Sequence, residues 1–261
     1  MDSLTIAIKA AIDAGRTIKD LYDRGDIETQ VKDDLTPVTN ADMASNTIIM
    51  EQLSGTGIPV LSEENKSIPH KERKSWDRMW IVDPLDGTKE FLKENGEFTV
   101  NIALIEGRVP FLGVIYAPVT AELYFACPGK GSFKTVVKEE ENDIQKIIAR
   151  SDKLPLAQDT QPAKVAVSRS HMNELTRNYI MSRQAGGEKP LLVSRGSSLK
   201  ICMVAEGSVA YYPRFGPTME WDTAAGHAIV RYAGKALKKI DSGEELSYNK
   251  DELLNPDFIA E

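Results

Sequence analysis

The sequence predicts an α/β protein of two lobes, and three of its features lead to this prediction. Between residues 98 and 126, apolar runs separated by short polar turns are typical of antiparallel strands. Between residues 164 and 234, strand-like and helix-like segments alternate, which is typical of an α/β unit. Residues 154–162 contain Pro and Gln without periodicity, and they separate the two patterns. We therefore expect an α+β lobe over residues 1–150 and an α/β lobe over residues 151–261.

Composition limits the class of protein. The chain has 261 residues, a hydrophobic fraction of 41% and a net charge of −7, with its basic residues scattered. This balance argues against a general nucleic-acid surface. The two cysteines, Cys127 and Cys202, fit neither a zinc spacing nor a disulfide framework. With no basic leader and no transmembrane-length apolar run, a cytoplasmic protein is expected. Peripheral association at the inner face of the membrane is left open, and a monomer is favoured.

The first two predicted elements are helices. Apolar residues at near-helical spacing over residues 4–22 predict an opening amphipathic helix. A polar, turn-rich segment follows, in which Asn40 or Asp42 would cap a second helix that ends near Leu53. From this segment alone, capping is the expected role of Asp42.

Two strands are expected to end in carboxylates. Residues 58–61 form a short strand candidate that leads into Glu63 and Glu64, although an exposed acidic loop explains this pair equally well. The apolar run 79–82 is typical of a buried strand, so Asp83 would stand at its end. Pro84 favours a turn, and Asp86 follows it.

The segment Asp83-Pro84-Leu85-Asp86-Gly87-Thr88 organises the chain, and its second half suits an anion. Gly87 has no side chain, so a ligand would approach the backbone closely there. Thr88 would open a short helix with free N–H groups. Mg²⁺ prefers carboxylate and phosphate oxygens, so two Asp beside such a turn suggest metal-assisted phosphoryl chemistry. An Asp-Gly turn with solvated carboxylates explains the hexapeptide alone equally well.

The remaining elements complete the two patterns. In the first lobe, strands are predicted over residues 98–105, 109–115 and 121–126. In the second lobe, the predicted order is a strand at 164–167, a helix at 172–184, a strand at 191–193, a helix from 196 to about 207, a strand at 209–212 and a helix from 221 to 234.

Four carboxylates are candidates for one site. Strand ends would deliver Glu63, Asp83 and Asp86, and a helix start would deliver Asp222. Like charges that share a site are costly unless cations compensate them or their pKa values rise. More than one divalent cation is the simplest resolution. An N-cap role for Asp222 is compatible with metal binding.

These segments together resemble the inositol monophosphatase superfamily of Mg²⁺-dependent, lithium-sensitive phosphatases, and most closely its CysQ-type 3′(2′),5′-bisphosphate nucleotidases. The segments that carry the resemblance are 61–64, 83–91, 96–104, 168–171, 196–200, 212–218 and 221–226. It fails over about 138–162 and after Gly234. It implies a fold of alternating helix and sheet layers, an α-β-α-β-α sandwich, with a metal-binding first lobe and a substrate-selecting second lobe.

The resemblance also implies roles for individual residues. The metal ligands would be Glu63, Asp83, Asp86, Asp222 and the Leu85 carbonyl. Asp42 and Thr88 would orient and deprotonate the attacking water, with Glu63 as a further catalytic residue. The substrate-binding residues would be Glu63, Leu85, Asp86, Gly87, Thr88, Ser170, His171, Gly196, Ser197, Ser198, Lys200, Arg214 and Asp222.

Within that substrate set, the second lobe would choose the substrate. Lys200 and Arg214 would bind the non-reacting phosphate, and His171 would stack on adenine. An ordinary His beside a helix cap is nearly as good an interpretation of His171.

The activity that follows from the resemblance is Mg²⁺-dependent removal of the 3′-phosphate of adenosine 3′,5′-bisphosphate, with two or more Mg²⁺ per site. Its physiological purpose would be clearance of a by-product of sulfate assimilation. An inositol phosphate phosphatase is the near alternative. A nucleotide-binding regulator without catalysis is an alternative of another class, and the complete carboxylate set with Asp42 and Thr88 argues against it.

Overall fold

A seven-stranded mixed sheet forms the centre of the protein. The computed structural model describes residues 2–31, 37–65, 68–157, 163–169, 172–184 and 189–261. The central sheet has the order β3-β4-β5-β6-β7-β8-β9, and only β3 and β4 pair in parallel. Its strands are β3 (Val60–Ser62), β4 (Arg78–Asp86), β5 (Thr99–Glu106), β6 (Val109–Ala117), β7 (Glu122–Cys127), β8 (Gly131–Val136) and β9 (Asp152–Lys153). The antiparallel meander expected after residue 98 is confirmed.

Three small sheets and the helices surround the central sheet. The small sheets contain β1 (Thr29–Val31), β2 (Pro37–Thr39), β10 (Lys164–Ser168), β11 (Leu191–Arg195), β12 (Tyr212–Arg214), β13 (Leu237–Lys239) and β14 (Phe258–Ala260). The α-helices are α1 (Ser3–Arg24), α2 (Asn40–Ser54), α3 (His70–Arg73), α4 (Thr88–Leu92), α5 (Ile144–Ala149), α6 (Glu174–Ser182), α7 (Leu199–Glu206) and α8 (Glu220–Tyr232), and η1 (Glu63–Asn65) is a 3₁₀ turn. In the described part of the chain, no helix is both long and apolar enough to cross a membrane.

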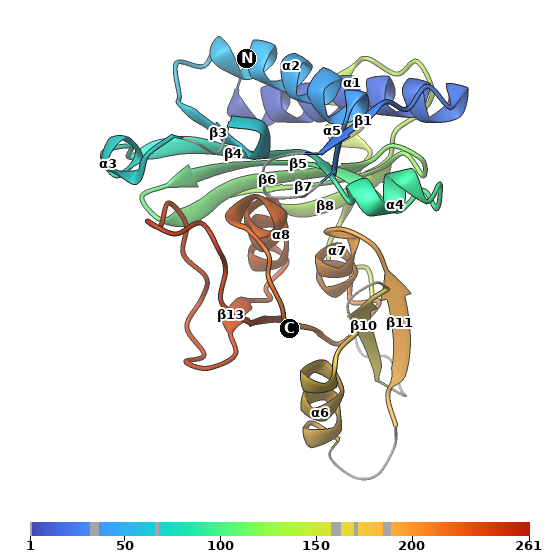
Figure 1. The fold of residues 1–261 in the computed structure, drawn as a ribbon, viewed down its shortest axis with the longest axis vertical. Helices are drawn as coiled ribbons and strands as arrows, with labels where there is room; N and C mark the ends of the chain where they lie inside the picture. Colours follow the sequence, from blue (N-terminus) through green and yellow to red (C-terminus); the bar gives the residue numbers. More distant parts are fainter. Residues whose placement is uncertain (1, 32–36, 66–67, 158–162, 170–171, 185–188) are drawn as a thin grey trace.

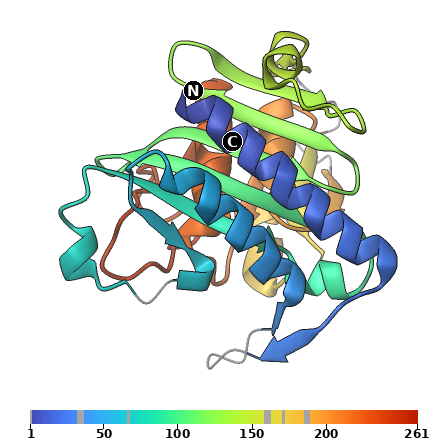
Figure 2. The same cartoon turned by 90° about the horizontal axis from the view of Figure 1, so that it is seen from above.

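The elements lie in layers, as Figure 1 shows. Helices α1 and α2 lie side by side across one face of the central sheet (Figure 2). Helices α7 and α8 cover the opposite face, followed by the two small sheets that contain β10 to β14 and then α6, while β1 lies on the side of α1 and α2 (Figure 1). The expected layered α-β-α-β-α arrangement is therefore confirmed.

A separate apolar core fills each face of the central sheet. One core joins α1 and α2 to the sheet and includes Ile8, Trp80 and Phe98. The other joins α7 and α8 to it. A Cβ at Gly113 in β6 would lie 2.3 Å from the Ala225 carbonyl oxygen of α8, so only glycine permits this close approach. This packing places α8 directly against the sheet.

Strand β4 departs from the prediction. The sequence predicted a strand end at Val82 and a turn at Pro84, but β4 continues through Asp86. Its parallel partner β3 ends opposite Val82, so Pro84 lies beyond that pairing and removes no hydrogen bond from it. On the β5 side the register shifts between Asp83 and Asp86. This irregularity replaces the predicted turn.

Other differences concern short elements. Strands β8 and β9 and helix α5 were not predicted, and the strand expected at residues 209–212 is β12, displaced toward Arg214. Ala210 and Tyr211 still hydrogen-bond to β10 through the backbone, which explains the displaced prediction. The boundary between lobes near residue 150 stays a prediction.

Candidate active site

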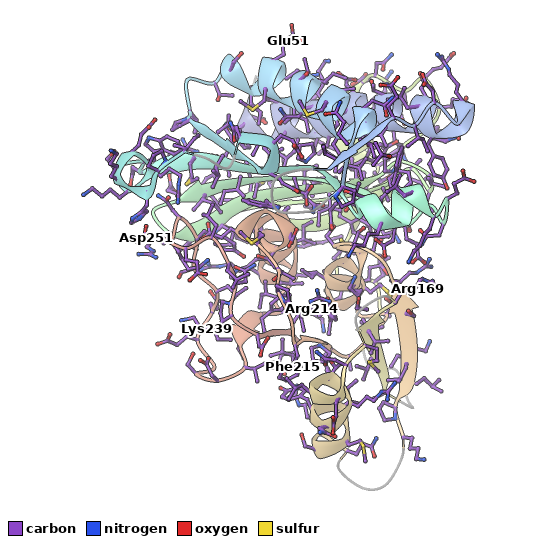
Figure 3. All side chains as sticks on the ribbon, in the orientation of Figure 1. Glu51, Arg169, Arg214, Phe215, Lys239 and Asp251 are labelled. Carbon is purple, nitrogen blue, oxygen red and sulfur yellow. The ribbon has the colours of Figure 1, made fainter. Side chains whose placement is uncertain are left out.

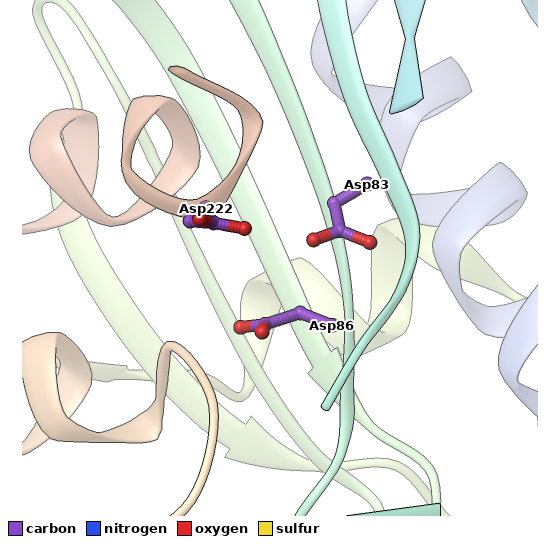
Figure 4. A group of neighbouring side chains, drawn as sticks. All are labelled: Asp83, Asp86 and Asp222. Carbon is purple, nitrogen blue, oxygen red and sulfur yellow. The ribbon is translucent and has the colours of Figure 1, made fainter. Parts of the chain in front are cut away.

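Three of the predicted carboxylates meet between strand β4 and helix α8. One oxygen each of Asp83, Asp86 and Asp222 lies within 4.8 Å of the others. Figure 4 shows Asp83 and Asp86 on neighbouring parts of β4, with Asp222 facing them from the start of α8. Residues 139 positions apart in sequence are thus brought together as predicted, since 222 − 83 = 139.

Burial raises the pKa values of all three of these carboxyl groups. Burial, and then the charges of Glu63, Asp86 and Asp222, raise the pKa of Asp83 well above its ordinary value. Burial, and then the charge of Asp86, raises the pKa of Asp222 to about 7. Burial also raises the pKa of Asp86, although nearby Lys200 opposes this. Glu63, the first residue of η1, contributes to the same field, but it is not among the three carboxylates that lie within 4.8 Å of one another, so its role as a metal ligand stays a prediction.

This donor set fits a hard divalent cation. All the ligating atoms offered are carboxylate oxygens, which Mg²⁺ prefers, and a cation would relieve their mutual repulsion. Leu85 is buried between Asp83 and Asp86, and its N–H donates to Asp83 Oδ1 at 3.1 Å. The residues present therefore fit the metal that the sequence predicts.

Asp42 and Asp222 occupy equivalent positions on their helices, one turn inside the N-terminus. The sequence predicted Asn40 or Asp42 as the N-cap of the first of these helices and allowed an N-cap role for Asp222, but the N-caps are Thr39 and Met219. Asp222 Oδ2 accepts from the Met219 N–H at 2.7 Å, and Asp42 Oδ2 accepts from the Thr39 N–H at 2.8 Å. The capping contact thus comes from the third residue of each helix, and it fixes the orientation of each carboxylate.

Asp42 and Thr88 are brought together as expected. The Thr88 hydroxyl donates to Asp42 Oδ1 at 3.4 Å, while the Thr39 hydroxyl donates to Oδ2 at 2.5 Å. Asp42 is buried, and Thr88 is half-buried. The two oxygens of Asp42 therefore face different partners, and Oδ1 is the one directed at Thr88.

Asp86 is held by Ser198, which the sequence assigned to substrate binding, and by Thr99 and Asn101, which it did not assign to the site. Its Oδ2 accepts from the Ser198 N–H at 2.6 Å, from Asn101 Nδ2 at 3.4 Å and from Thr99 Oγ1 at 3.5 Å. Thr99 and Asn101 lie on β5 directly opposite this part of β4. Their polarity within an otherwise apolar strand was the signal that could have found them.

The loop before α7 closes over the turn that contains Gly87. Ser197 donates through Oγ to the Asp86 carbonyl at 2.8 Å and to the Glu97 carbonyl at 2.7 Å. A Cβ at Gly87, whose φ is 97°, would lie 2.2 Å from Ser197 Oγ. Ser197 itself has a positive φ of 49°, a strained conformation that these contacts maintain.

Lys200 and Arg214 line the same cavity as Asp86 and Asp222. Lys200 is buried, and its Nζ donates to the carbonyls of Arg195 at 3.2 Å and Ser197 at 2.5 Å. Burial lowers the pKa of Lys200 to about 8, although the charge of Asp86 opposes this.

Arg214 keeps an unused donor. It lies centrally below α7 and α8 (Figure 3), and its Nη2 donates to the Pro217 carbonyl at 3.2 Å. Its buried Nε has no hydrogen-bond partner within the described residues. Gly196, Ser197 and Ser198 also line this cavity. Ser170 and His171 lie outside the described residues.

Comparison with known proteins identifies the family of the chain. The model of the inositol monophosphatase family matches residues 1–259. The chain is 46% identical over 252 residues to the 3′(2′),5′-bisphosphate nucleotidase CysQ of Salmonella typhimurium, and the match covers 95% of each chain. It is 45% identical over 253 residues to the protein of the same name from Escherichia coli strain K12, also covering 95% of each.

The fold comparison gives the same result. The crystal structure of CysQ from Bacteroides thetaiotaomicron superposes with a TM-score of 0.88 at 46% identity, covering 98% of this chain and 95% of that one. The extragenic suppressor protein SuhB from Bartonella henselae gives a TM-score of 0.73 at 26% identity, covering 98% and 92%. The sequence and fold comparisons agree, and the chain belongs to the inositol monophosphatase family.

Proposed function

We propose that this protein is a Mg²⁺-dependent 3′(2′),5′-bisphosphate nucleotidase, which hydrolyses adenosine 3′,5′-bisphosphate to AMP and phosphate in the clearance of a by-product of sulfur assimilation. One observation carries the proposal: Asp86 and Asp222 of the acidic cluster line the same cavity as the cationic pair Lys200 and Arg214. The acidic residues suit a metal and the phosphate bound to it, and the cationic pair suits a further phosphate. The relatives of known name with near-complete coverage support the same substrate class.

Metal binding would fall to the carboxylates described above. Glu63, Asp83, Asp86 and Asp222, with the Leu85 carbonyl, would hold two or more Mg²⁺. When bound, Mg²⁺ supplies positive charge that stabilises the entering and leaving oxygens of an in-line displacement. Titration calorimetry with Mg²⁺ measures the number of ions bound.

Asp42 and Thr88 would prepare the water. A Thr hydroxyl cannot serve as a base at neutral pH unaided, but it can accept the proton of a water while it passes its own to a carboxylate. Asp42 Oδ1 is 3.4 Å from the Thr88 hydroxyl, and Thr39 prevents the carboxylate from rotating away. Glu63 would orient the same water, and Gly87 and Thr88 would contact the scissile phosphate.

Lys200 and Arg214 would bind the non-reacting 5′-phosphate. The buried Nε of Arg214 lacks a partner among the described residues, and a phosphate oxygen would satisfy it. Gly196, Ser197 and Ser198 lie beside these cations in the cavity and would add contacts to the substrate. Ser170 and His171 complete the proposed substrate site, with His171 stacking on adenine.

A panel of substrates tests the proposal. Phosphate release with Mg²⁺ is measured on adenosine 3′,5′-bisphosphate, inositol 1-phosphate and fructose 1,6-bisphosphate. The proposal expects the highest kcat/KM on the first. Preference for inositol 1-phosphate would identify an inositol phosphate phosphatase, and binding of the bisphosphate without turnover would identify a regulator.

The oligomeric state and the location in the cell are part of the same proposal. The protein would act as a cytoplasmic monomer. Size-exclusion chromatography tests the oligomeric state, and cell fractionation tests whether the protein is free or associated with the inner face of the membrane.

A further inference from the structure

Glu97, between α4 and β5, is a nearly buried carboxylate outside the acidic cluster, with only 7% of its surface exposed. Its Oε1 accepts from Arg169 Nη2 at 2.9 Å and from Arg195 Nη1 at 3.2 Å. Its Oε2 accepts from Arg169 Nε at 3.0 Å and from the Gly196 N–H at 2.8 Å. Both oxygens therefore face donors only, and these donors come from β11 and from the segments that follow β10 and β11.

The backbone around Glu97 fits the same loop closely. The Glu97 carbonyl accepts from Ser197 Oγ at 2.7 Å. A Cβ at Gly196 would lie 2.7 Å from that carbonyl oxygen and 2.9 Å from Glu97 Cβ. Glu97 thus binds two consecutive residues of the loop, Gly196 through its side chain and Ser197 through its backbone carbonyl.

The charge of Glu97 is maintained in this environment. Burial raises the pKa of Glu97, but the hydrogen bonds from Arg169, Gly196 and Arg195 outweigh it, and the pKa is lowered overall. Arg169 lies beside β11 at the edge of the molecule (Figure 3), and its side chain is 50% exposed. An ion pair with so exposed a partner adds little stability. The buried contact with the loop is the more consequential one.

The loop 195–198, to which Glu97 is hydrogen-bonded, determines the positions of groups that are proposed to bind the substrate. The carbonyls of Arg195 and Ser197 accept from Lys200 Nζ, and the Ser198 N–H donates to Asp86. The strained positive φ of Ser197 lies between these contacts. Movement of the loop would therefore displace Lys200 within the cavity.

We infer that Glu97 is a positioning residue, which holds the loop 195–198 in the shape that receives the non-reacting phosphate of the substrate. This inference rests on the proposed function. Arg169 and Arg195 act through Glu97 as its charged partners. The inference goes beyond the metal and substrate contacts, because Glu97 itself touches neither the acidic cluster nor Arg214 through any contact that the described residues show.

Glu97→Gln is a sharp test because the side chain keeps its size. Whichever way the amide is oriented, its NH₂ group faces N–H donors, so the loop contact is weakened without a cavity. We expect kcat/KM for adenosine 3′,5′-bisphosphate to fall about tenfold or more, which is the effect typical of a lost charged hydrogen bond. For adenosine 3′-monophosphate, which has no 5′-phosphate, we expect a fall of less than about threefold, within the ordinary context dependence of such effects.

A second readout does not need catalysis. Calorimetry in the presence of EDTA measures binding of AMP, which carries the 5′-phosphate but no 3′-phosphate, and Glu97→Gln should weaken this binding by a similar factor. Glu141→Gln is the matched control, because Glu141 accepts from Arg150 and from the Lys138 N–H far from the cavity. It should leave both kinetic constants and AMP binding unchanged.

The outcomes separate this inference from the proposed function. Equal losses on both substrates in Glu97→Gln, or unchanged AMP binding, overturn the inference even when the wild type hydrolyses the bisphosphate. A wild type that binds AMP but hydrolyses none of the panel overturns the proposed function alone. Arg169→Ala should show the same selective loss to a smaller degree. If Arg169→Ala and Glu97→Gln change the thermal stability only, Arg169 and Glu97 have a merely structural role.

Discussion

The Ser198 N–H donates a hydrogen bond of 2.6 Å to Asp86 Oδ2, and this contact joins the loop before α7 to strand β4. Asp86 belongs to the acidic cluster, and Ser198 directly precedes the helix that carries Lys200. Within the described residues, Thr99 and Asn101 donate to the same oxygen. The proposed metal site and the proposed 5′-phosphate site are therefore connected through a single carboxylate.

Asp83→Asn should separate the stability of the fold from its activity. Asp83 is buried among like charges, so its neutralisation should leave the melting temperature in EDTA unchanged or higher. Turnover with Mg²⁺ should fall at least about a hundredfold, because several kcal/mol of charge stabilisation are lost with the metal. Differential scanning calorimetry and a phosphate-release assay measure the two effects. Full activity, or activity of the wild type in excess chelator, would contradict a metal site here.

Thr88→Ala should remove the proton relay while it leaves the metal carboxylates intact. Loss of a general base typically costs about 10²–10⁴-fold in rate, and we expect this loss in kcat, with KM changed less. Asp42→Asn should cost a similar factor. The double variant should be hardly slower than either single one, because residues that act as a unit are not additive. Wild-type kcat in Thr88→Ala would show that the water is activated without the relay.

The sequence predicted which acidic residues meet but not how they are held. Asp83 and Asp222 stood out because strands and helix starts deliver their side chains to a common edge. Thr99, Asn101 and Glu97 did not stand out, because their roles depend on partners far away in the chain, such as Ser198 and Arg169. Pairing between distant segments is set by packing of the whole fold, which local periodicity does not contain.

Some predictions of secondary structure were wrong for related reasons. Pro84 suggested a turn by its own chemistry, yet the short partner strand β3 leaves room for β4 to continue past it. Strand β8 was missed because Ser132, Lys134 and Thr135 break its apolar pattern. Lys134 is nevertheless accommodated there, since it pairs with Glu122 and Glu206.

Arg214→Ala should reveal whether this residue reads the 5′-phosphate. A charge-assisted contact is worth roughly 1.5–3 kcal/mol, or about 10- to 150-fold in affinity. We expect kcat/KM to fall by such a factor on adenosine 3′,5′-bisphosphate and little on adenosine 3′-monophosphate. Some of the loss should appear in kcat, because binding energy from a remote group can be used at the reacting centre.

The comparison of these two substrates is its own control. If both lose activity equally, Arg214 contacts the scissile phosphate or supports the fold. If neither loses activity, the 5′-phosphate is bound elsewhere, with Arg195 and Arg169 as the next residues to test.

The buried side chain of His227 should make the stability of the protein depend on pH. This residue of α8 is fully buried; its Nδ1 is 3.0 Å from the Tyr248 hydroxyl, and its Nε2 is 3.9 Å from Glu245 Oε2. Burial, and then the charge of Arg231, lowers the pKa of His227 to about 3. Glu245 favours the protonated form, but its side chain is 43% exposed, so solvent screens its charge.

The sign of the effect follows from that depressed pKa. In the unfolded chain the imidazole has its ordinary pKa of about 6.5, so below this pH the unfolded state binds a proton that the folded state does not. The contribution of His227 to stability is therefore fully present above about pH 6.5. It decreases as the pH falls toward 3, by up to about 1.4 kcal/mol per pH unit. His227→Phe should remove this part of the slope, as denaturant unfolding between pH 4 and 8 would measure. The loss of unfolding free energy in His227→Phe at pH 8 reports the change in packing alone. If the dependence of the unfolding free energy on pH between 4 and 6 is the same in the variant as in the wild type, His227 is already protonated in the folded protein.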